Sequence, residues 1–214
     1  MASHEFRTPL STILSSAALM SRYLEKGEID KCHKHINRIK SGVDHLNAVL
    51  EDFLSLGKIE DGRVQFQPAT FLLEDRLQQL ASEMQEIAKP HQTINVTCDP
   101  SFEIYTDKAI LRNALINLIS NAIKFSEEGC SVDIKAEKVD GFYRISITDH
   151  GMGIPEEEQK YMFDRFFRAS NVSNIQGTGL GLYIVKSYIE MMNGNISYIS
   201  EQGKGTTFTI HLPA

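Results

Sequence analysis

The sequence lacks any apolar run long enough to span a bilayer, and its N-terminus has no signal-peptide pattern. Lysines and arginines form no block that would follow a nucleic-acid backbone, and the formal net charge is −6. Only three cysteines occur, Cys32, Cys98 and Cys130, and their wide separation favours neither a disulfide framework nor a zinc site. We therefore expect a cytoplasmic protein with no nucleic-acid partner.

Two helical heptad patterns occupy the N-terminal quarter of the chain. They are separated by Glu25, Lys26 and Gly27, and two such helices joined by a short turn predict an antiparallel hairpin. With 42% hydrophobic residues among 214, the chain can bury a substantial core and form more than one domain. The apolar or small heptad positions are Phe6, Leu10, Ile13, Ala17, Met20 and Leu24, then Ile29, Cys32, Ile36, Ile39, Val43, Leu46, Leu50 and Phe53.

Further apolar residues lie beside these seams. The apolar face is therefore wider than one partner helix can cover. They are Leu14, Leu19, Val49 and Leu54. We expect the hairpin to pair with a second copy in a homodimeric four-helix bundle, and the alternative is a hairpin folded back on its own C-terminal domain. Residues 57–63 are interpreted as a linker, which gives domains 1–62 and 63–214.

The rest of the chain alternates short strand patterns with helical ones, typical of an α+β domain. A strand at 64–67 closed by Pro68 is followed by a helix at 71–88. Asp107 is predicted to open a helix that runs to about Phe125. Strands are predicted at 93–98, 102–105, 130–137, 142–148, 196–200 and 206–212, and a helix at 182–192.

Two glycine-rich segments flank a predicted lid. Gly151 and Gly153 follow Asp149, and Gly177, Gly179 and Gly181 directly precede an apolar-periodic helix. Bare backbone N–H groups at a helix N-terminus predict a phosphate site. A P-loop is excluded because Leu182 and Tyr183 follow Gly181, and a dinucleotide fingerprint because no strand directly precedes Gly177.

Asp149 ends an alternating strand and falls on the same face as Ile145 and Ile147, toward the core. A buried carboxylate needs partners, and the exocyclic amino group of a purine is one. The alternative is an aspartate that opens a tight turn at a strand end.

A stripe of amides follows the helix at 107–125, where Asn113, Asn117 and Asn121 are spaced by four and Lys124 comes next. A solvent-exposed helix face normally consists of Lys and Glu, which have a higher helix propensity than Asn. The stripe therefore indicates amide oxygens that bind a hard cation, with Lys124 placed to bind phosphate oxygens. The alternative is a polar stripe hydrogen-bonded to neighbouring backbone.

Six motifs in order resemble those of the sensor histidine kinases of two-component signalling, whose ATPase fold is shared with gyrase B, Hsp90 and MutL. The H box matches residues 3–10, the N box 117–125, the first glycine box 149–153, the F box 163–167, the second glycine box 177–182 and a terminal glycine motif 203–206. The resemblance covers nearly the whole chain. It implies an α/β sandwich, a mixed sheet backed by three helices, after a dimerising hairpin.

The resemblance also implies roles for individual residues. His4 would accept the γ-phosphoryl group of ATP, Asn121 would bind Mg²⁺, and Asp149 would bind the adenine amino group. The phosphoryl group would then pass to an aspartate of a response regulator. The implied nucleotide-binding set is Asn117, Asn121, Lys124, Phe125, Asp149, Gly151, Gly153, Arg165, Gly177, Thr178, Gly179, Leu180 and Gly181.

Chemistry favours His4 over the other six histidines, because Glu5 beside it can hold or take the second ring proton. Histidines 33, 35 and 45 are interpreted as ordinary helix-surface residues. Thr8, one turn beyond His4, has in this family the role of orienting a water against the regulator's phospho-aspartate, which implies phosphatase activity. The alternative is that Thr8 only caps a helix that begins at Pro9, with His4 an ordinary residue near the terminus.

Two rival functions remain at this point: an ATPase or chaperone-like member of the same superfamily, and a scaffold that binds nucleotide without catalysis. The first would lack the His4-Glu5 pair, and the intact Asn121, Asp149 and glycines argue against the second. Only three residues precede His4, whereas the first helix of such a hairpin normally starts well before its histidine. We therefore expect a piece of a longer protein, with any sensor region or membrane attachment upstream.

Overall fold

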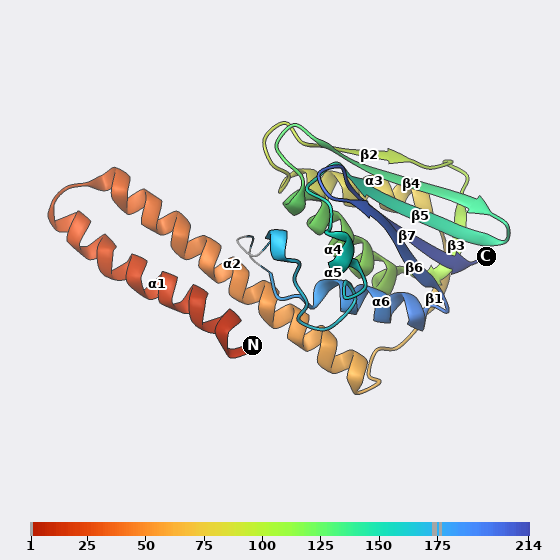
Figure 1. The fold of residues 1–214 in the computed structure, drawn as a ribbon, viewed down its shortest axis with the longest axis horizontal. Coiled ribbons are helices and arrows are strands. Elements are labelled where there is room, and N and C mark those ends of the chain that lie inside the picture. The colour runs from red at the N-terminus through yellow and green to blue at the C-terminus, as the bar shows by residue number, and fades with distance from the viewer. Residues whose placement is uncertain (1, 173–174, 176) are drawn as a thin grey trace. The chain divides into compact units, whose positions relative to one another are not determined.

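The computed structural model describes residues 2–172, 175 and 177–214, with side chains from residue 6 onward. The chain divides into two compact units, Met1–Asp61 and Gly62–Ala214 (Figure 1). In the described part of the chain, no helix combines the length and hydropathy that crossing a membrane requires.

The first unit is an antiparallel hairpin of α1 (Ala2–Glu25) and α2 (Ile29–Glu60), joined by a turn in which Gly27 has a φ of 68°. Because α1 already includes Thr8 and continues through Pro9, the alternative in which Thr8 caps a helix that begins at Pro9 is wrong. The linker predicted from Gly57 is also too early, since α2 continues to Glu60 and the Asp61 N–H donates to the Gly57 carbonyl at 3.0 Å.

The two helices pack through a seam that differs from the predicted one. His35, Gly42, Val49 and Leu56 are buried on α2 at seven-residue spacing. A Cβ on Gly42 would lie 2.9 Å from Ile13 Cγ1, so the helices approach closely there. The predicted seam is thus right only in part: Cys32 is buried and Phe6 stacks on Phe53, whereas other predicted seam residues are exposed, namely Leu10, Leu24, Ile29, Val43 and Leu50.

His35 contradicts the prediction that it lies on the helix surface. Its side chain is only 6% exposed and stacks on the ring of Tyr23, with centroids 5.5 Å apart. The heptad spacing of α2 turns His35 toward α1. A polar residue that was expected to face solvent is therefore part of the seam.

The second unit is an α/β sandwich, as predicted. Its five-stranded mixed sheet has the order β2-β4-β5-β7-β6, and α3, α4 and α6 lie together beside it (Figure 1). Only β2 and β4 are parallel. The sheet strands are β2 (Thr93–Thr97), β4 (Ser131–Val139), β5 (Phe142–Asp149), β6 (Asn195–Glu201) and β7 (Gly205–Pro213), and the helices are α3 (Leu73–Gln85), α4 (Lys108–Phe125) and α6 (Gly181–Met191).

Four small elements complete this unit. β1 (Pro68–Leu72) and β3 (Glu103–Asp107) form a separate antiparallel pair. A short helix, α5 (Glu156–Gln159), and a 3₁₀ turn, η1 (Ser170–Val172), lie between β5 and α6.

Two predictions near the start of this unit are wrong at their boundaries. The strand expected at 64–67 begins instead at Pro68, which is tolerated because β1 pairs with β3 alone. The helix expected at 71–88 begins at Leu73, since Phe71 and Leu72 belong to β1, and it ends at Gln85. The prediction for α4 is confirmed: the Asp107 carboxylate accepts from the N–H groups of Ala109 and Ile110, both at 2.9 Å, and caps the helix.

Candidate nucleotide-binding site

Asp149 ends β5 on the buried face of the sheet, as its alternation with Ile145 and Ile147 predicts. Its side chain is only 7% exposed, and Oδ1 accepts a hydrogen bond from the Gly151 N–H at 2.9 Å. Burial raises the pKa of this carboxyl, while backbone hydrogen bonds from Gly151 and Thr206 and the nearby His150 oppose the rise. The aspartate therefore both opens a turn and presents a buried acidic group.

The first glycine box is a place of close backbone contact. A Cβ on Gly151 would lie 2.3 Å from the Phe125 carbonyl oxygen at the end of α4. A Cβ on Gly153, whose φ is +58°, would lie 2.0 Å from the Glu201 carbonyl oxygen. Only glycine fits at these two positions, so the box fixes the Asp149 loop between α4 and the turn after β6.

The second glycine box lies against the amide stripe of α4. A Cβ on Gly181 would be 2.9 Å from Asn117 Oδ1, and one on Gly177 would be 2.8 Å from Lys124 Nζ. The N-cap residue of α6, Leu180, makes no capping hydrogen bond with its side chain, and its N–H donates to Thr178 Oγ1 at 3.1 Å. A helix N-terminus without such a cap, beside a lysine, is suited to an anion such as a phosphate.

The stripe on α4 contains the bond that one of the two interpretations requires. Asn117 Nδ2 donates to the Asn113 carbonyl at 3.2 Å, as the backbone-bonded interpretation expects. Asn121 and Lys124 are half-buried one turn and two turns later. No group of three His, Cys, Asp or Glu side chains in the described part of the chain is placed to hold a metal. A protein site for Mg²⁺ often supplies only one or two ligands and leaves the others to water and phosphate oxygens.

Arg165 lies on α6. Its Nη2 donates to the Tyr183 hydroxyl at 2.6 Å, and its guanidinium stacks 4.5 Å from the centre of that ring. In the predicted lid at 152–176, Asn171 Nδ2 donates to the Gly153 carbonyl at 2.9 Å. Residues 173, 174 and 176 of that lid lie outside the described residues.

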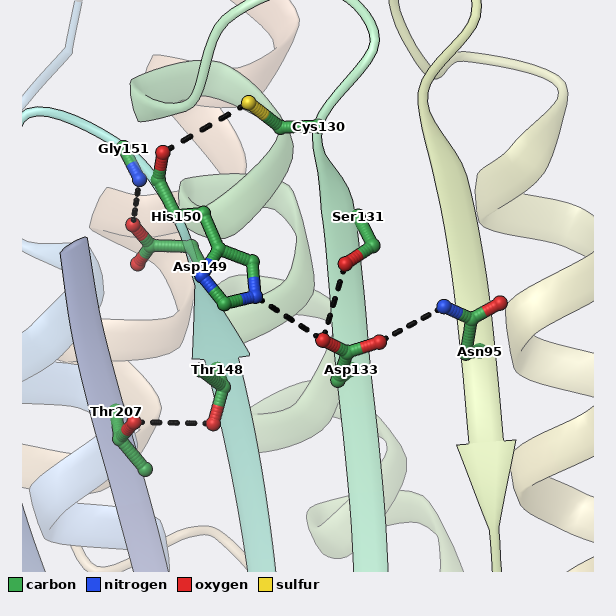
Figure 2. A network of polar contacts seen from close by, with 9 residues as sticks. All are labelled: Asn95, Cys130, Ser131, Asp133, Thr148, Asp149, His150, Gly151 and Thr207. Carbon is green, nitrogen blue, oxygen red and sulfur yellow. Dashed lines mark hydrogen bonds and ion pairs between the residues drawn. The ribbon is translucent and has the colours of Figure 1, made fainter. Parts of the chain in front are cut away.

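A polar network beside Asp149 was not predicted from the sequence. His150 Nε2 lies 3.2 Å from Asp133 Oδ2, whose carboxylate also accepts from Asn95 and Ser131 (Figure 2). Burial raises the pKa of Asp133, but hydrogen bonds from Asn95, His150 and Ser131 outweigh it and leave the pKa low. This network ties the residue after Asp149 to β4. The available clue was the alternation of β4, which places Asp133 on the open face of the sheet.

The predicted phospho-acceptor residues lie on α1. The backbone of His4 and Glu5 is helical, and their side chains are outside the described part of the chain. Thr8 is exposed one turn later on the same continuous helix. The geometry therefore supports the helical spacing on which the interpretation of the H box depends.

A sheet with an acidic strand end, an amide stripe on α4 and two glycine boxes defines an ATP-binding domain of the gyrase B and Hsp90 type. Two family models match the chain. One is the "Histidine kinase-, DNA gyrase B-, and HSP90-like ATPase" over residues 106–214, and the other the "His Kinase A (phospho-acceptor) domain" over residues 1–62. The chain belongs to the sensor histidine kinases of two-component signalling.

Individual relatives agree with this family assignment. The chain is 34% identical to the autoinducer 2 sensor kinase/phosphatase LuxQ of Vibrio parahaemolyticus over 99% of its own length and 25% of LuxQ. It thus spans about a quarter of the length of these curated relatives. Among solved structures, full-length ShkA in complex with AMPPNP superposes with a TM-score of 0.70, at 30% identity, over 99% of this chain and 44% of ShkA. ThkA in complex with the response regulator TrrA gives 0.75, at 25% identity, over 99% and 59%.

Proposed function

We propose that the chain is the catalytic portion of a sensor histidine kinase that uses Mg²⁺-ATP to phosphorylate His4 and passes the phosphoryl group to an aspartate of a response regulator. The observation that carries this proposal is the convergence of Asp149, Asn117 and Lys124 with the second glycine box at the uncapped start of α6. ShkA with AMPPNP and ThkA with TrrA support the nucleotide and the partner.

In this function each part of the site has one task. Asp149 accepts from the adenine amino group, and Lys124 and the N–H groups at Gly179 and Gly181 face the phosphates. Arg165 is assigned to the phosphate oxygens once it leaves Tyr183. The amide oxygen of Asn121 would hold Mg²⁺, whose charge would offset that of the phosphates. Phe125, Gly151, Gly153, Gly177, Thr178 and Leu180 complete the pocket wall.

The transfer itself is nucleophilic. A neutral ring nitrogen of His4 attacks the γ-phosphorus, the bond to the β,γ-bridging oxygen breaks, and ADP leaves. Glu5 holds the proton on the other ring nitrogen, which keeps the attacking nitrogen unprotonated. The product is an acid-labile phosphohistidine.

Autophosphorylation tests this function directly. We expect the wild-type chain to gain acid-labile label from γ-labelled ATP in the presence of Mg²⁺, and His4→Gln and Asn121→Ala to gain none. The His4 variant should still bind ATP with wild-type affinity. A wild-type chain that binds ATP without labelling would instead favour the non-catalytic scaffold, and label retained by His4→Gln would refute the assignment of His4.

Phosphatase activity toward the regulator is proposed for Thr8, which the LuxQ likeness supports because that relative is named a kinase/phosphatase. Thr8 is exposed on α1, and its carbonyl accepts from the Thr12 hydroxyl at 3.1 Å. We expect Thr8→Ala to lose dephosphorylation of a phosphorylated receiver domain by at least about tenfold, as loss of a water-orienting group typically costs. His4 labelling should remain near wild type. A parallel fall in both activities and in Tm would show that the residue is structural only.

A further inference from the structure

The last turn of α4 has a complete set of hydrogen-bond partners. The final four carbonyls of a helix find no partner inside it, and their partners must come from elsewhere. Here each carbonyl has one. Ala122 O accepts from the N–H and hydroxyl of Ser126, Ile123 O from Gln92 Nε2 at 3.2 Å, Lys124 O from Lys89 Nζ at 2.9 Å, and Phe125 O from the Met152 N–H at 3.2 Å.

Two of these partners come from one turn between α3 and β2, residues 89–92, which we call the 89–92 turn. Gln92 is only 3% exposed, and its Nε2 also lies within hydrogen-bond distance of Ser126 Oγ and the Glu127 carbonyl. Gln92 Oε1 accepts from the Lys89 N–H at 2.9 Å, which locks the turn on itself. The buried amide thus bonds to the end of α4 through its nitrogen and to its own turn through its oxygen, so both of its polar atoms have partners.

The backbone of this turn is adapted to that contact. His91 has a φ of 61°, in the left-handed region that residues other than glycine seldom adopt. Such a conformation is retained where the surrounding structure requires it. The Gly129 N–H donates to the Pro90 carbonyl at 3.2 Å and anchors the turn to the loop after α4.

The charge of Lys89 also suits its position. The C-terminus of a helix carries a partial negative charge, and an ammonium group there is favourable. Lys89 Nζ donates to the carbonyls of both Lys124 and Ser126. The ammonium group thus binds the carbonyls of the residues before and after Phe125, while the Phe125 carbonyl accepts from Met152 in the first glycine box.

The same helical turn presents the nucleotide-binding side chains. Asn121, Lys124 and Phe125 lie on it, and Lys124 Nζ approaches the Gly177 position. The last turn is thus bonded both to the 89–92 turn and to Met152. A small rotation of this turn would displace the amide and ammonium groups together.

We propose that the 89–92 turn is a positioning element of the nucleotide site, in which Lys89 and Gln92 fix the last turn of α4 so that Asn121, Lys124 and Phe125 meet the nucleotide. This inference rests on the proposed function of the second unit as an ATP-binding domain. Lys89 and Gln92 act through α4 and touch no part of the nucleotide themselves.

Nucleotide affinity of the folded protein tests the proposal. Lys89→Met keeps the aliphatic stem and removes the ammonium group, and Gln92→Ala removes the amide. We expect each to raise the Kd for Mg²⁺-ADP, measured by titration calorimetry well below Tm, by about tenfold, the lower end of what loss of a supporting shell costs. Lys89→Arg, which keeps a donor at this position, should restore most of the affinity.

Arg112→Met is the matched control, because Arg112 on α4 also forms an ion pair with α3, through Glu83, but near the start of the helix. It should change the Kd by less than about twofold, as ordinary surface substitutions do, whatever its effect on Tm. A Kd within twofold of wild type in both Lys89→Met and Gln92→Ala, or an equal rise in Arg112→Met, would overturn the proposal. A wild-type chain that binds no ADP would instead overturn the proposed function.

Discussion

Asp149→Asn is expected to weaken ATP binding strongly without lowering the stability of the protein. The carboxylate is the acceptor assigned to the adenine amino group. An asparagine has only one side-chain oxygen: if that oxygen stays with the Gly151 N–H, the amide N–H groups face the purine, and if it turns toward the purine, the Gly151 N–H loses its partner. A hydrogen bond to a charged group contributes about 1.5 to 3 kcal/mol, so the affinity should fall by about 100-fold. Calorimetric titration of both proteins with Mg²⁺-ATP measures this loss.

The sign of the stability effect follows from the pKa of Asp149, which burial raises above its ordinary value. The folded state therefore binds this proton more tightly than the unfolded state does. The stability that the group contributes is present below the unfolded pKa and is lost as pH rises through the folded pKa. At neutral pH the ionised side chain destabilises the fold, and the neutral amide removes that cost. Tm of Asp149→Asn should thus equal or exceed wild type at pH 7, with the difference vanishing in acid.

Asp133→Asn provides a control of opposite sign on the neighbouring strand. The pKa of Asp133 is lowered because its hydrogen bonds to Asn95, His150 and Ser131 outweigh the effect of burial. Its contribution to stability is present above the unfolded pKa and is lost as pH falls through the folded pKa. This variant should therefore be less stable than wild type at pH 7 and still bind ATP. Asp149→Asn with wild-type ATP affinity would contradict the role given to Asp149.

Much of the site was predictable because its residues lie on strongly patterned elements. The strict alternation of β5 places Asp149 beside Ile145 and Ile147 in the core, and the long apolar periodicity of α4 places Asn117 and Lys124 on one stripe. Glycines at these spacings have one good explanation, close backbone approach, and the contacts at Gly151 and Gly153 are of that kind. Local pattern and tertiary packing agree at these residues.

Contacts between distant segments could not be predicted, because they leave no pattern in the sequence. Gln92 reaches Ile123 across 31 residues, and nothing in the sequence around either residue indicates the bond. The ends of β1 and α2 were missed because pairing with β3 and packing inside the hairpin override what Pro68 and Gly57 favour locally. A heptad repeat, likewise, shows that a helix has partners but not which partner each position faces, and the seam of the hairpin was misassigned for that reason.

That misassigned face provides the basis for the dimer. Seven large apolar side chains of the hairpin are between 43% and 74% exposed: Leu10, Leu14, Leu24, Ile29, Val43, Leu50 and Leu54. The hairpin seam itself is closed by other residues, so this face has room for a second copy. Two hairpins related by a two-fold axis would bury it in a four-helix bundle, which we propose for this chain.

Leu50→Asp is accordingly expected to convert a dimer into a monomer. The two-fold axis places two new carboxylates in one interface, and an unpaired buried charge costs about 3 to 5 kcal/mol. Ile199→Asp is the matched control, because Ile199 on β6 is 81% exposed, more than any leucine of the hairpin, yet belongs to the second unit. Sedimentation equilibrium should give a dimer for wild type and Ile199→Asp and a monomer for Leu50→Asp. A wild-type monomer at high micromolar concentration would favour a hairpin folded on its own second unit, and a dimeric Leu50→Asp would place the interface on another face.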